Sequence, residues 1–498
     1  MPSTHEALRR CLRSKWAPPA AVLLLFALSR LGFYALGVRF DASTLTSFWQ
    51  FLEVEQLRDD LLRSVYHQHS QPPLFNLYLG AVLKAAPGDA TPWFRASYLA
   101  LGAALHLALY RLLIRLGVSV RVSLVFVALF LLSPACIAYE NHLLYTYPVA
   151  VVLIGAALFL HRFAERGRAR DGVAFFALLA TAVWLRSVLH LVWFVGCLAL
   201  VLFVMRGAQR RVAVAALLPL CLVVGLYAKN LALFGSPATS TWLGMSVARR
   251  ITQQTSLPQR RELVRQGVLS PLALIEPFSP LHHYPPRYRT VAGPDVPVLR
   301  AARRSSGFTN FNHVAYVQIS RIYLSDAWTL LRRNPELYLE SLPRAWLRFF
   351  ASPTDYWFAR SNVLALGRLD RAYSALLYGV PEAWSPPPGP VDWEPMANPW
   401  RGAGYLWIAA SLGSVVFAFV AGARAVRRTR ADRSRGLVLL FAAFTVVYVA
   451  CTVNLIELGE NNRFRMMVEP LLFALVACAV TSAADLRRRF QAPDSRVG

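Results

Sequence analysis

Long apolar runs separated by short arginine-rich segments are the feature that most constrains how this chain folds. Many of the runs approach the roughly 20 residues that an α-helix needs to cross the hydrocarbon core of a bilayer. Hydrophobic residues make up 56% of the chain and charged residues only 16%, whereas a soluble globular protein carries roughly 25% charged residues. The pattern predicts a mainly α, polytopic helical membrane protein.

The basic residues lie between the apolar runs rather than along one face. Lysine and arginine total 53 against 27 acidic residues, which gives a formal net charge of +26. Nucleic-acid binding would need those charges clustered on an exposed surface, so we expect no nucleic-acid partner. Short basic loops are instead typical of the cytoplasmic side of a membrane protein. Arg9, Arg10, Arg13 and Lys15 precede the first run and predict a cytoplasmic N-terminus.

Placing every basic cluster between spans on the cytoplasmic side predicts about ten spans with both termini cytoplasmic. The apolar segment 72–86 is short and contains Lys84, so we expect a re-entrant or juxtamembrane helix there. The predicted spans are 18–38, 92–116, 121–138, 148–162, 172–186, 189–205, 212–232, 402–422, 436–453 and 466–484.

This topology divides the chain into three parts. Residues 1–233 form an N-terminal transmembrane catalytic module whose first outer loop is 39–71. Residues 234–401 form an extracytoplasmic region, with helical periodicity at 316–331 and 335–350. Residues 402–498 supply the C-terminal transmembrane helices and a cytoplasmic tail.

Ionisable residues gather at the outer ends of the predicted spans, where they are costly unless they are used. Carboxylates, imidazoles and cations on one face suit a sugar carried on a polyprenyl phosphate, because fixed cations stabilise a departing phosphate. A carboxylate within reach of the acceptor hydroxyl serves as a general base, and one base without an enzyme nucleophile would invert the anomeric centre. The candidates are Asp41, His69, Glu140, His142, Arg186, Lys229, Arg463 and Arg465.

Three short motifs resemble the GT-C superfamily of integral membrane glycosyltransferases. The similarity is to the bacterial branch related to protein O-mannosyltransferases and to lipid A aminoarabinose transferases. The motifs are Arg39-Phe40-Asp41, His69-Ser70-Gln71-Pro72-Pro73-Leu74-Phe75 and Asn462-Arg463-Phe464-Arg465.

The resemblance implies that Asp41 is the general base and that Arg463 and Arg465 hold the lipid phosphate. It also implies that His69 belongs to a His-Pro-Pro signature beside the active site. Two departures are evident, since Ala42 stands where many relatives have glutamate and two residues separate His69 from Pro72. Glu53, Glu55 or Glu140 are therefore alternative or additional carboxylates.

Several of these residues also have a purely structural interpretation. Asp41 is also a suitable helix cap, Lys229 is placed to extend toward the interface, and the arginine pair is equally suited to anchoring a helix end. No metal-ligand spacing occurs in the sequence. Some members of the superfamily use a divalent cation and others do not, so the resemblance leaves a divalent cation open. The absence of a Walker or dinucleotide motif disfavours a nucleotide-sugar donor.

The leading hypothesis is a glycosyltransferase of the bacterial inner membrane, active on its extracytoplasmic face. It would take a polyprenyl-phosphate sugar as donor and a lipid, glycan or protein as acceptor, with membrane lipids around it. Asn310, Asn312 and His313 are candidates for acceptor choice. The alternatives are a ligase that transfers an oligosaccharide from a lipid diphosphate, as O-antigen ligases do, and a transporter of a lipid or sugar.

Overall fold

Helices dominate the computed structural model, which describes residues 16–291, 293–378 and 404–491. Within these ranges no strand forms, and the β-type pairing is limited to two isolated bridges. The prediction of a mainly α protein is therefore confirmed. Most of the predicted cytoplasmic N-terminus and all of the proline-rich segment 381–399 lie outside the described residues. The end of the predicted cytoplasmic C-terminal tail lies outside them as well.

Seven helices in the described ranges are long and apolar enough to cross a membrane, which supports a multi-pass membrane protein. An eighth span results if the bent pair α8 (Val120–Leu131) and α9 (Pro134–Glu140) crosses as one unit. The seven are α2 (Ala17–Ala35), α7 (Thr91–Arg115), α10 (Thr146–Arg166), the run Arg206–Phe234 containing α13 (Gln209–Phe234), α22 (Tyr405–Ala425), α23 (Arg430–Ile456) and the part of α24 (Asn461–Gln491) up to Ala484.

Two predicted spans correspond to shorter helices. The helix α11 (Ala169–Leu185) has 17 residues and α12 (Leu191–Val204) has 14. At a rise of about 1.5 Å per residue, neither reaches the thickness of a typical hydrocarbon core. The count of about ten spans is therefore not established by helix length, although a helix lies at each of the ten predicted positions.

The bend between α8 and α9 has a local cause in Ser133 and Pro134. The Ser133 side chain accepts a hydrogen bond from the backbone N–H of Cys136, which caps the new helix. Pro134 occupies the first position of α9, where its missing N–H costs nothing. The two axes differ by 58°, and this bend is followed by the loop that carries Asn141 and His142.

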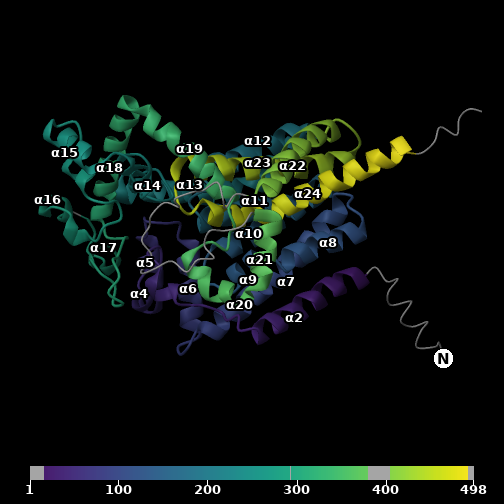
Figure 1. Cartoon of the computed structure of the whole chain (residues 1–498), viewed down its shortest axis with the longest axis horizontal. Coiled ribbons are helices and arrows are strands. Elements are labelled where there is room, and N and C mark those ends of the chain that lie inside the picture. The colour runs from purple at the N-terminus through teal and green to yellow at the C-terminus, as the bar shows by residue number, and fades with distance from the viewer. Residues whose placement is uncertain (1–15, 292, 379–403, 492–498) are drawn as a thin grey trace, which may run out of the picture.

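The centre of the bundle is α10, which packs against α7, α11, α23 and α24 (Figure 1). About two thirds of its apolar window is buried, as is also true of α23 and α24. By contrast, only 17% of the corresponding window of α2 is buried. The helix α2 thus lies at the periphery, with most of its apolar surface left for lipid.

The segment between α2 and α7 folds into short helices over the end of the bundle. It contains α3 (Thr44–Ser47), α4 (Val54–Asp59), α5 (Leu61–Tyr66) and α6 (Leu74–Ala85). The 12-residue α6 matches the short helix expected at 72–86. Its buried side chains include Phe75 and Leu79, so α6 joins the main core rather than standing apart from it.

A second group of helices gathers at one end of the molecule (Figure 1) and has its own apolar core. It includes α14 (Leu243–Arg250), α15 (Leu257–Arg265) and α18 (Ala315–Arg333), with Trp242, Met245 and Tyr316 among the buried side chains. From there α19 (Pro335–Phe350) runs back against α24, and α20 (Arg360–Leu366) and α21 (Arg368–Tyr373) contact α9. The later part of the chain therefore returns to the loop that follows α9.

A close approach of α14 to α18 depends on Gly244. A Cβ atom at this position would overlap the backbone carbonyl of Ser320, and backbone cannot move aside as a flexible side chain can. A Gly244→Ala variant should therefore lose about 1–3 kcal/mol of stability. Gly225 of α13 is the matched control, since an added Cβ meets nothing within 4 Å there. Gly225→Ala should keep or raise the melting temperature in detergent, and equal melting of the two variants would contradict this packing.

Candidate active site

The loops that follow α2 and α9 pair through their backbones at Asp41 and His142. The Asp41 N–H donates to the Asn141 carbonyl at 2.8 Å, and the Leu143 N–H donates to the Asp41 carbonyl at 2.9 Å. These loops were predicted as separate outer loops, 100 positions apart in the sequence. Their pairing brings the predicted base Asp41 beside the predicted substrate residue His142.

The Asp41 carboxylate is fixed at both of its oxygens. Oδ1 accepts a hydrogen bond from the Ser43 N–H at 2.8 Å, and Oδ2 lies 3.5 Å from Nδ1 of His142. Burial opposes ionisation, but the contacts with His142 and Ser43 outweigh it and lower the pKa of Asp41 to about 2. The side chain is 29% exposed. Asp41 is thus an ionised carboxylate that remains accessible to solvent. Its hydrogen bond from the Ser43 N–H also lies directly before the first residue of α3.

His142 is buried and lies flat against Phe358. The two ring centroids are 4.1 Å apart and the planes differ by 5°. Burial lowers the pKa of His142, so the ring is neutral near pH 7. Neither of its ring nitrogens has a hydrogen-bond partner among the described residues. The neutral imidazole therefore contacts Asp41 only through the 3.5 Å approach of Nδ1 to Oδ2, and both nitrogens are left without a hydrogen bond.

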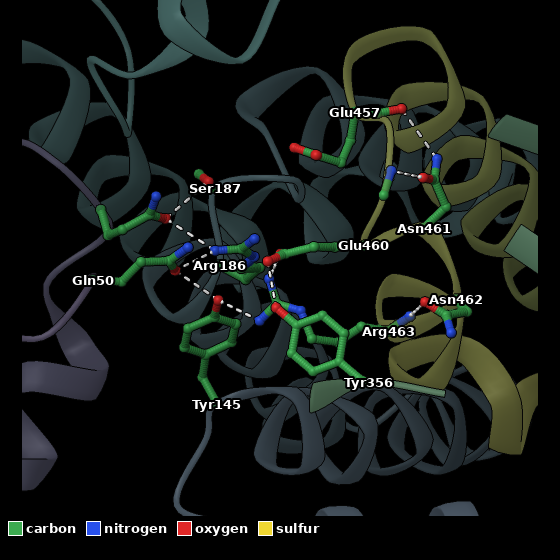
Figure 2. Close-up of polar contacts among 12 residues, drawn as sticks. Gln50, Tyr145, Arg186, Ser187, Tyr356, Glu457, Glu460, Asn461, Asn462 and Arg463 are labelled. Carbon is green, nitrogen blue, oxygen red and sulfur yellow. Dashed lines mark hydrogen bonds and ion pairs between the residues drawn. The ribbon is translucent and has the colours of Figure 1, made fainter. Parts of the chain in front are cut away.

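A cationic cluster lies next to this pair and is built around Arg463 of α24 (Figure 2). Arg463 forms an ion pair with Glu460 and donates to the Tyr145 hydroxyl at 2.9 Å. The Tyr145 hydroxyl in turn donates to Oε1 of Gln50 at 2.6 Å. The stacking partner of His142 connects to the same cluster, since the Phe358 and Tyr356 rings are 4.2 Å apart and Tyr356 donates to Glu460.

Arg186 enters the cluster from the turn after α11. Its guanidinium donates to Oε1 of Gln50 at 2.7 Å and to Oε1 of Gln71 at 3.2 Å. The guanidinium carbon also lies 4.6 Å from the ring centre of Tyr145 and 4.7 Å from that of Phe464. No carboxylate forms an ion pair with Arg186 in the described part of the chain, and its Nε has no hydrogen-bond partner there. Arg186 is therefore a buried cation held by neutral groups.

The cluster keeps an excess of positive charge. Glu460 is matched by Arg463, and Glu457 forms an ion pair with Arg249 at 2.6 Å. Burial opposes ionisation of Glu460, but Arg463 and the Tyr356 hydroxyl lower its pKa, so the carboxylate stays charged. With both carboxylates matched, Arg186 has no carboxylate partner in the described part of the chain, and neither has the neighbouring Arg250, which donates to the Glu457 carbonyl. An anionic ligand would supply the missing counter-charge.

Glu140, the second predicted catalytic carboxylate, is held in a different way. Arg30 of α2 donates to both of its oxygens at 2.8 Å, and the Tyr147 hydroxyl adds a third hydrogen bond at 2.8 Å. Both partners are largely buried. These contacts join α2, α9 and α10, so the Arg30–Glu140 ion pair has a structural role.

Two further predicted substrate residues, His69 and Lys229, also have protein partners. The ring nitrogens of His69 contact the Thr241 hydroxyl at 2.7 Å and the Asn312 carbonyl at 2.9 Å. Lys229 donates to the carbonyls of Tyr66 and Gln68 at 3.0 and 2.7 Å. These contacts connect the end of the first loop to the later chain, so His69 and Lys229 hold that loop in place.

Arg465 points away from Arg463. Its Nε lies 2.7 Å from Glu469, which also accepts a hydrogen bond from Tyr378 at 2.7 Å. The two arginines of the Asn-Arg-Phe-Arg motif therefore have separate carboxylate partners, Glu460 just before α24 and Glu469 within it.

The remaining candidates form hydrogen bonds within and between the loops. Glu53 accepts hydrogen bonds from the backbone N–H and hydroxyl of Ser305 at 2.6 and 2.9 Å. Asn312 accepts from the backbone N–H groups of His69 and Ser70, and Asn310 donates to two carbonyls of its own loop. Among the described residues, no group of three or more His, Cys, Asp or Glu side chains is arranged to hold a metal ion.

Sequence reasoning missed the neutral members of the cluster and the partner of Glu140. Gln50, Tyr145 and Tyr356 carry no charge and lie in loops, so no pattern distinguishes them. Arg30 did carry a signal, because it is a charged residue inside an apolar run, and such residues almost always have an internal partner.

No protein-family model matches this chain, and no curated protein sequence matches it significantly. The functional argument therefore depends on the geometry just described. A solvent-accessible carboxylate oriented by a neutral imidazole can accept a proton. A net-positive buried cluster beside it can hold an anion.

The Arg30–Glu140 ion pair predicts a large stability difference between two carboxylate variants. Glu140→Gln should lose about 3–5 kcal/mol, because it leaves the Arg30 guanidinium buried without its counter-charge. Glu165 is the matched control, since it pairs with Arg115 at 3.1 Å while both side chains are partly exposed, and Glu165→Gln should cost at most about 1 kcal/mol. Thermal melting in detergent checks this. A Glu140→Gln protein that melts like Glu165→Gln would contradict the structural role.

Proposed function

We propose that this protein is an inverting glycosyltransferase of the bacterial inner membrane that uses a polyprenyl-phosphate sugar as donor. The observation that carries the proposal is that the Asp41–His142 pair is connected, through the rings of Phe358 and Tyr356, to the cluster that contains Arg463 and the unpaired Arg186 cation. Sugar transfer from a lipid phosphate needs these two functions next to each other. The acceptor is an extracytoplasmic lipid, glycan or protein hydroxyl.

In this reaction Asp41 takes the proton from the acceptor hydroxyl. The acceptor oxygen forms a bond to the anomeric carbon from the face opposite the phosphate, and the bond between that carbon and the phosphate oxygen breaks. The polyprenyl phosphate leaves with the bonding electrons, and Arg186 and Arg463 stabilise its charge. His142 keeps the Asp41 carboxylate oriented toward the acceptor through the Nδ1 contact.

The membrane arrangement that fits this chemistry has about ten spans, with both termini in the cytoplasm and the site on the extracytoplasmic face. The shorter α11 and α12 then form a pair that spans a locally thinner region or inserts from the side. Arg186 lies at the turn between these two helices. That turn therefore belongs at the outer boundary, where a lipid phosphate is found.

The contacts of the other predicted residues support positioning roles within the same function. Glu140 holds the helices that precede the two paired loops. His69 and Lys229 hold the end of the first loop, and Arg465 holds α24 through Glu469. A divalent cation is not needed in this scheme, because the guanidinium groups supply the positive charge.

The role of Asp41 as base predicts a selective loss of transfer. Asp41→Asn should lower turnover by roughly 10²–10⁴-fold while the protein stays folded, since asparagine keeps the size of the side chain. Asp59 is the control, being an exposed aspartate in the same loop segment, and Asp59→Asn should transfer at the wild-type rate. The assay measures release of labelled sugar from a panel of polyprenyl-phosphate donors in the presence of an envelope extract. Near-normal turnover by Asp41→Asn would refute the assignment. Transfer only from a lipid-diphosphate glycan would instead favour the ligase.

The role of Arg186 predicts opposite effects on donor binding and on stability. Arg186→Gln removes a buried cation that has no carboxylate partner, so the melting temperature should stay the same or rise. The donor half-saturation concentration should rise roughly tenfold or more, because a charge-assisted hydrogen bond to phosphate is lost. The control is Arg344→Gln, at an exposed arginine of α19, and it should change neither quantity. A destabilised Arg186→Gln protein with unchanged donor saturation would assign Arg186 to the scaffold.

A further inference from the structure

A small pocket lies between α2, α7 and α9, next to the loop that carries Asn141. It is lined by Arg30, Phe33, Tyr34, Val38, Arg95, Leu99, Ile137 and Asn141. Most of this lining is apolar, and one side chain, Asn141, belongs to the residue whose carbonyl holds the Asp41 N–H. The pocket is thus close to the candidate site but separate from the Arg186 cluster.

Two guanidinium groups contact the ring of Tyr34, which lines this pocket; Arg95 belongs to the pocket lining as well, whereas Arg39 does not. The guanidinium carbon of Arg39 lies 3.9 Å from the ring centre of Tyr34, and that of Arg95 lies 4.7 Å from the same centre. In the part of the chain that the structure describes, neither arginine forms an ion pair with a carboxylate. Both cations therefore lack a counter-charge from the described residues, and an anion that contacts both would be stabilised.

The pocket's other arginine is already neutralised. Arg30 lines the inner wall and is paired with Glu140 through both carboxylate oxygens. The free positive charge at the pocket therefore belongs to Arg39 and Arg95. Arg39 also donates to the carbonyls of Tyr34 and Val38, which fixes its guanidinium over the ring.

The surroundings of the pocket indicate where its ligand comes from. Large apolar side chains of α2, among them Leu28 and Leu31, are exposed, as is Leu36 directly after the helix. Trp93, near the start of α7, is exposed as well, and tryptophan is typical of the level of the lipid headgroups. Charge at the headgroup level, next to a surface that acyl chains cover, matches a phospholipid rather than a soluble anion.

We propose that the surface around Tyr34, at the edge of this pocket, binds an anionic phospholipid, with Arg39 and Arg95 contacting its phosphate and the exposed face of α2 contacting its acyl chains. The site lies on the bilayer side of the Asn141 loop, so the bound lipid supports the backbone that carries Asp41. The proposal does not depend on glycosyl transfer, because it concerns the binding of a bilayer lipid.

Native mass spectrometry of the full-length protein in detergent tests this proposal, with phosphatidylglycerol and phosphatidylcholine as the two probes. The wild type should retain phosphatidylglycerol in preference to phosphatidylcholine. The Arg39→Gln/Arg95→Gln double variant should need roughly tenfold more phosphatidylglycerol for the same occupancy, since two cationic contacts are lost. The control is Arg332→Gln/Arg333→Gln, which removes two exposed arginines of α18 and should bind like the wild type.

Arg95 also allows a test that leaves the local fold intact. Its side chain makes no hydrogen bond to the rest of the described chain, so Arg95→Gln should melt like the wild type and still bind phosphatidylglycerol more weakly. Arg95→Lys should restore most of the binding. Equal retention by the double variant and the control would overturn the proposal, as would equal retention of the two lipids by the wild type. Displacement of phosphatidylglycerol by millimolar inorganic phosphate would also overturn it, in favour of a soluble anion.

Discussion

The buried ion pair between Arg30 and Glu140 is the contact on which the arrangement of the candidate site depends. It joins α2 to α9, and the Tyr147 hydroxyl adds α10 to the same carboxylate. The chain that leaves α2 carries Asp41, and the chain between α9 and α10 carries His142 and Tyr145. Because the three helices are held at one point, the two loops leave the bundle side by side and can pair through their backbones.

The chain between α9 and α10 contacts two positively charged regions. On one side, Tyr145 connects to Arg463, Gln50 and Arg186. On the other, Asn141 borders the pocket formed by α2 and α7. The carboxylates that are present in each place are already matched by arginine. Both regions therefore keep positive charge that the protein itself does not neutralise, and both lie where the proposed topology puts lipid phosphates.

The sequence predicts the helical membrane class and the loops that carry the polar residues, because hydrophobic runs and arginine clusters are direct consequences of bilayer insertion. It also singles out Asp41, His142, Arg186 and Arg463, which lie together or in connected contacts. It does not distinguish a polar side chain that faces a ligand from one that faces the protein. Glu140 and His69 have the residue types of a site, yet their partners lie in distant segments, which only the tertiary packing determines. Arg465 pairs with Glu469 four residues further along α24 and also donates to the distant Phe349 carbonyl.

The stacking of Phe358 on His142 has a consequence for how the chain is divided. Phe358 follows α19, so it belongs to the region assigned by sequence to the extracytoplasmic part rather than to the catalytic module. Asn362 likewise exchanges hydrogen bonds with the backbone of Arg39. A chimera that exchanged residues 234–401 would thus replace one wall of the candidate site along with the rest of that region. Under the proposed function, a change of acceptor would require that residues 352–362 change together with the loops after α2 and α9.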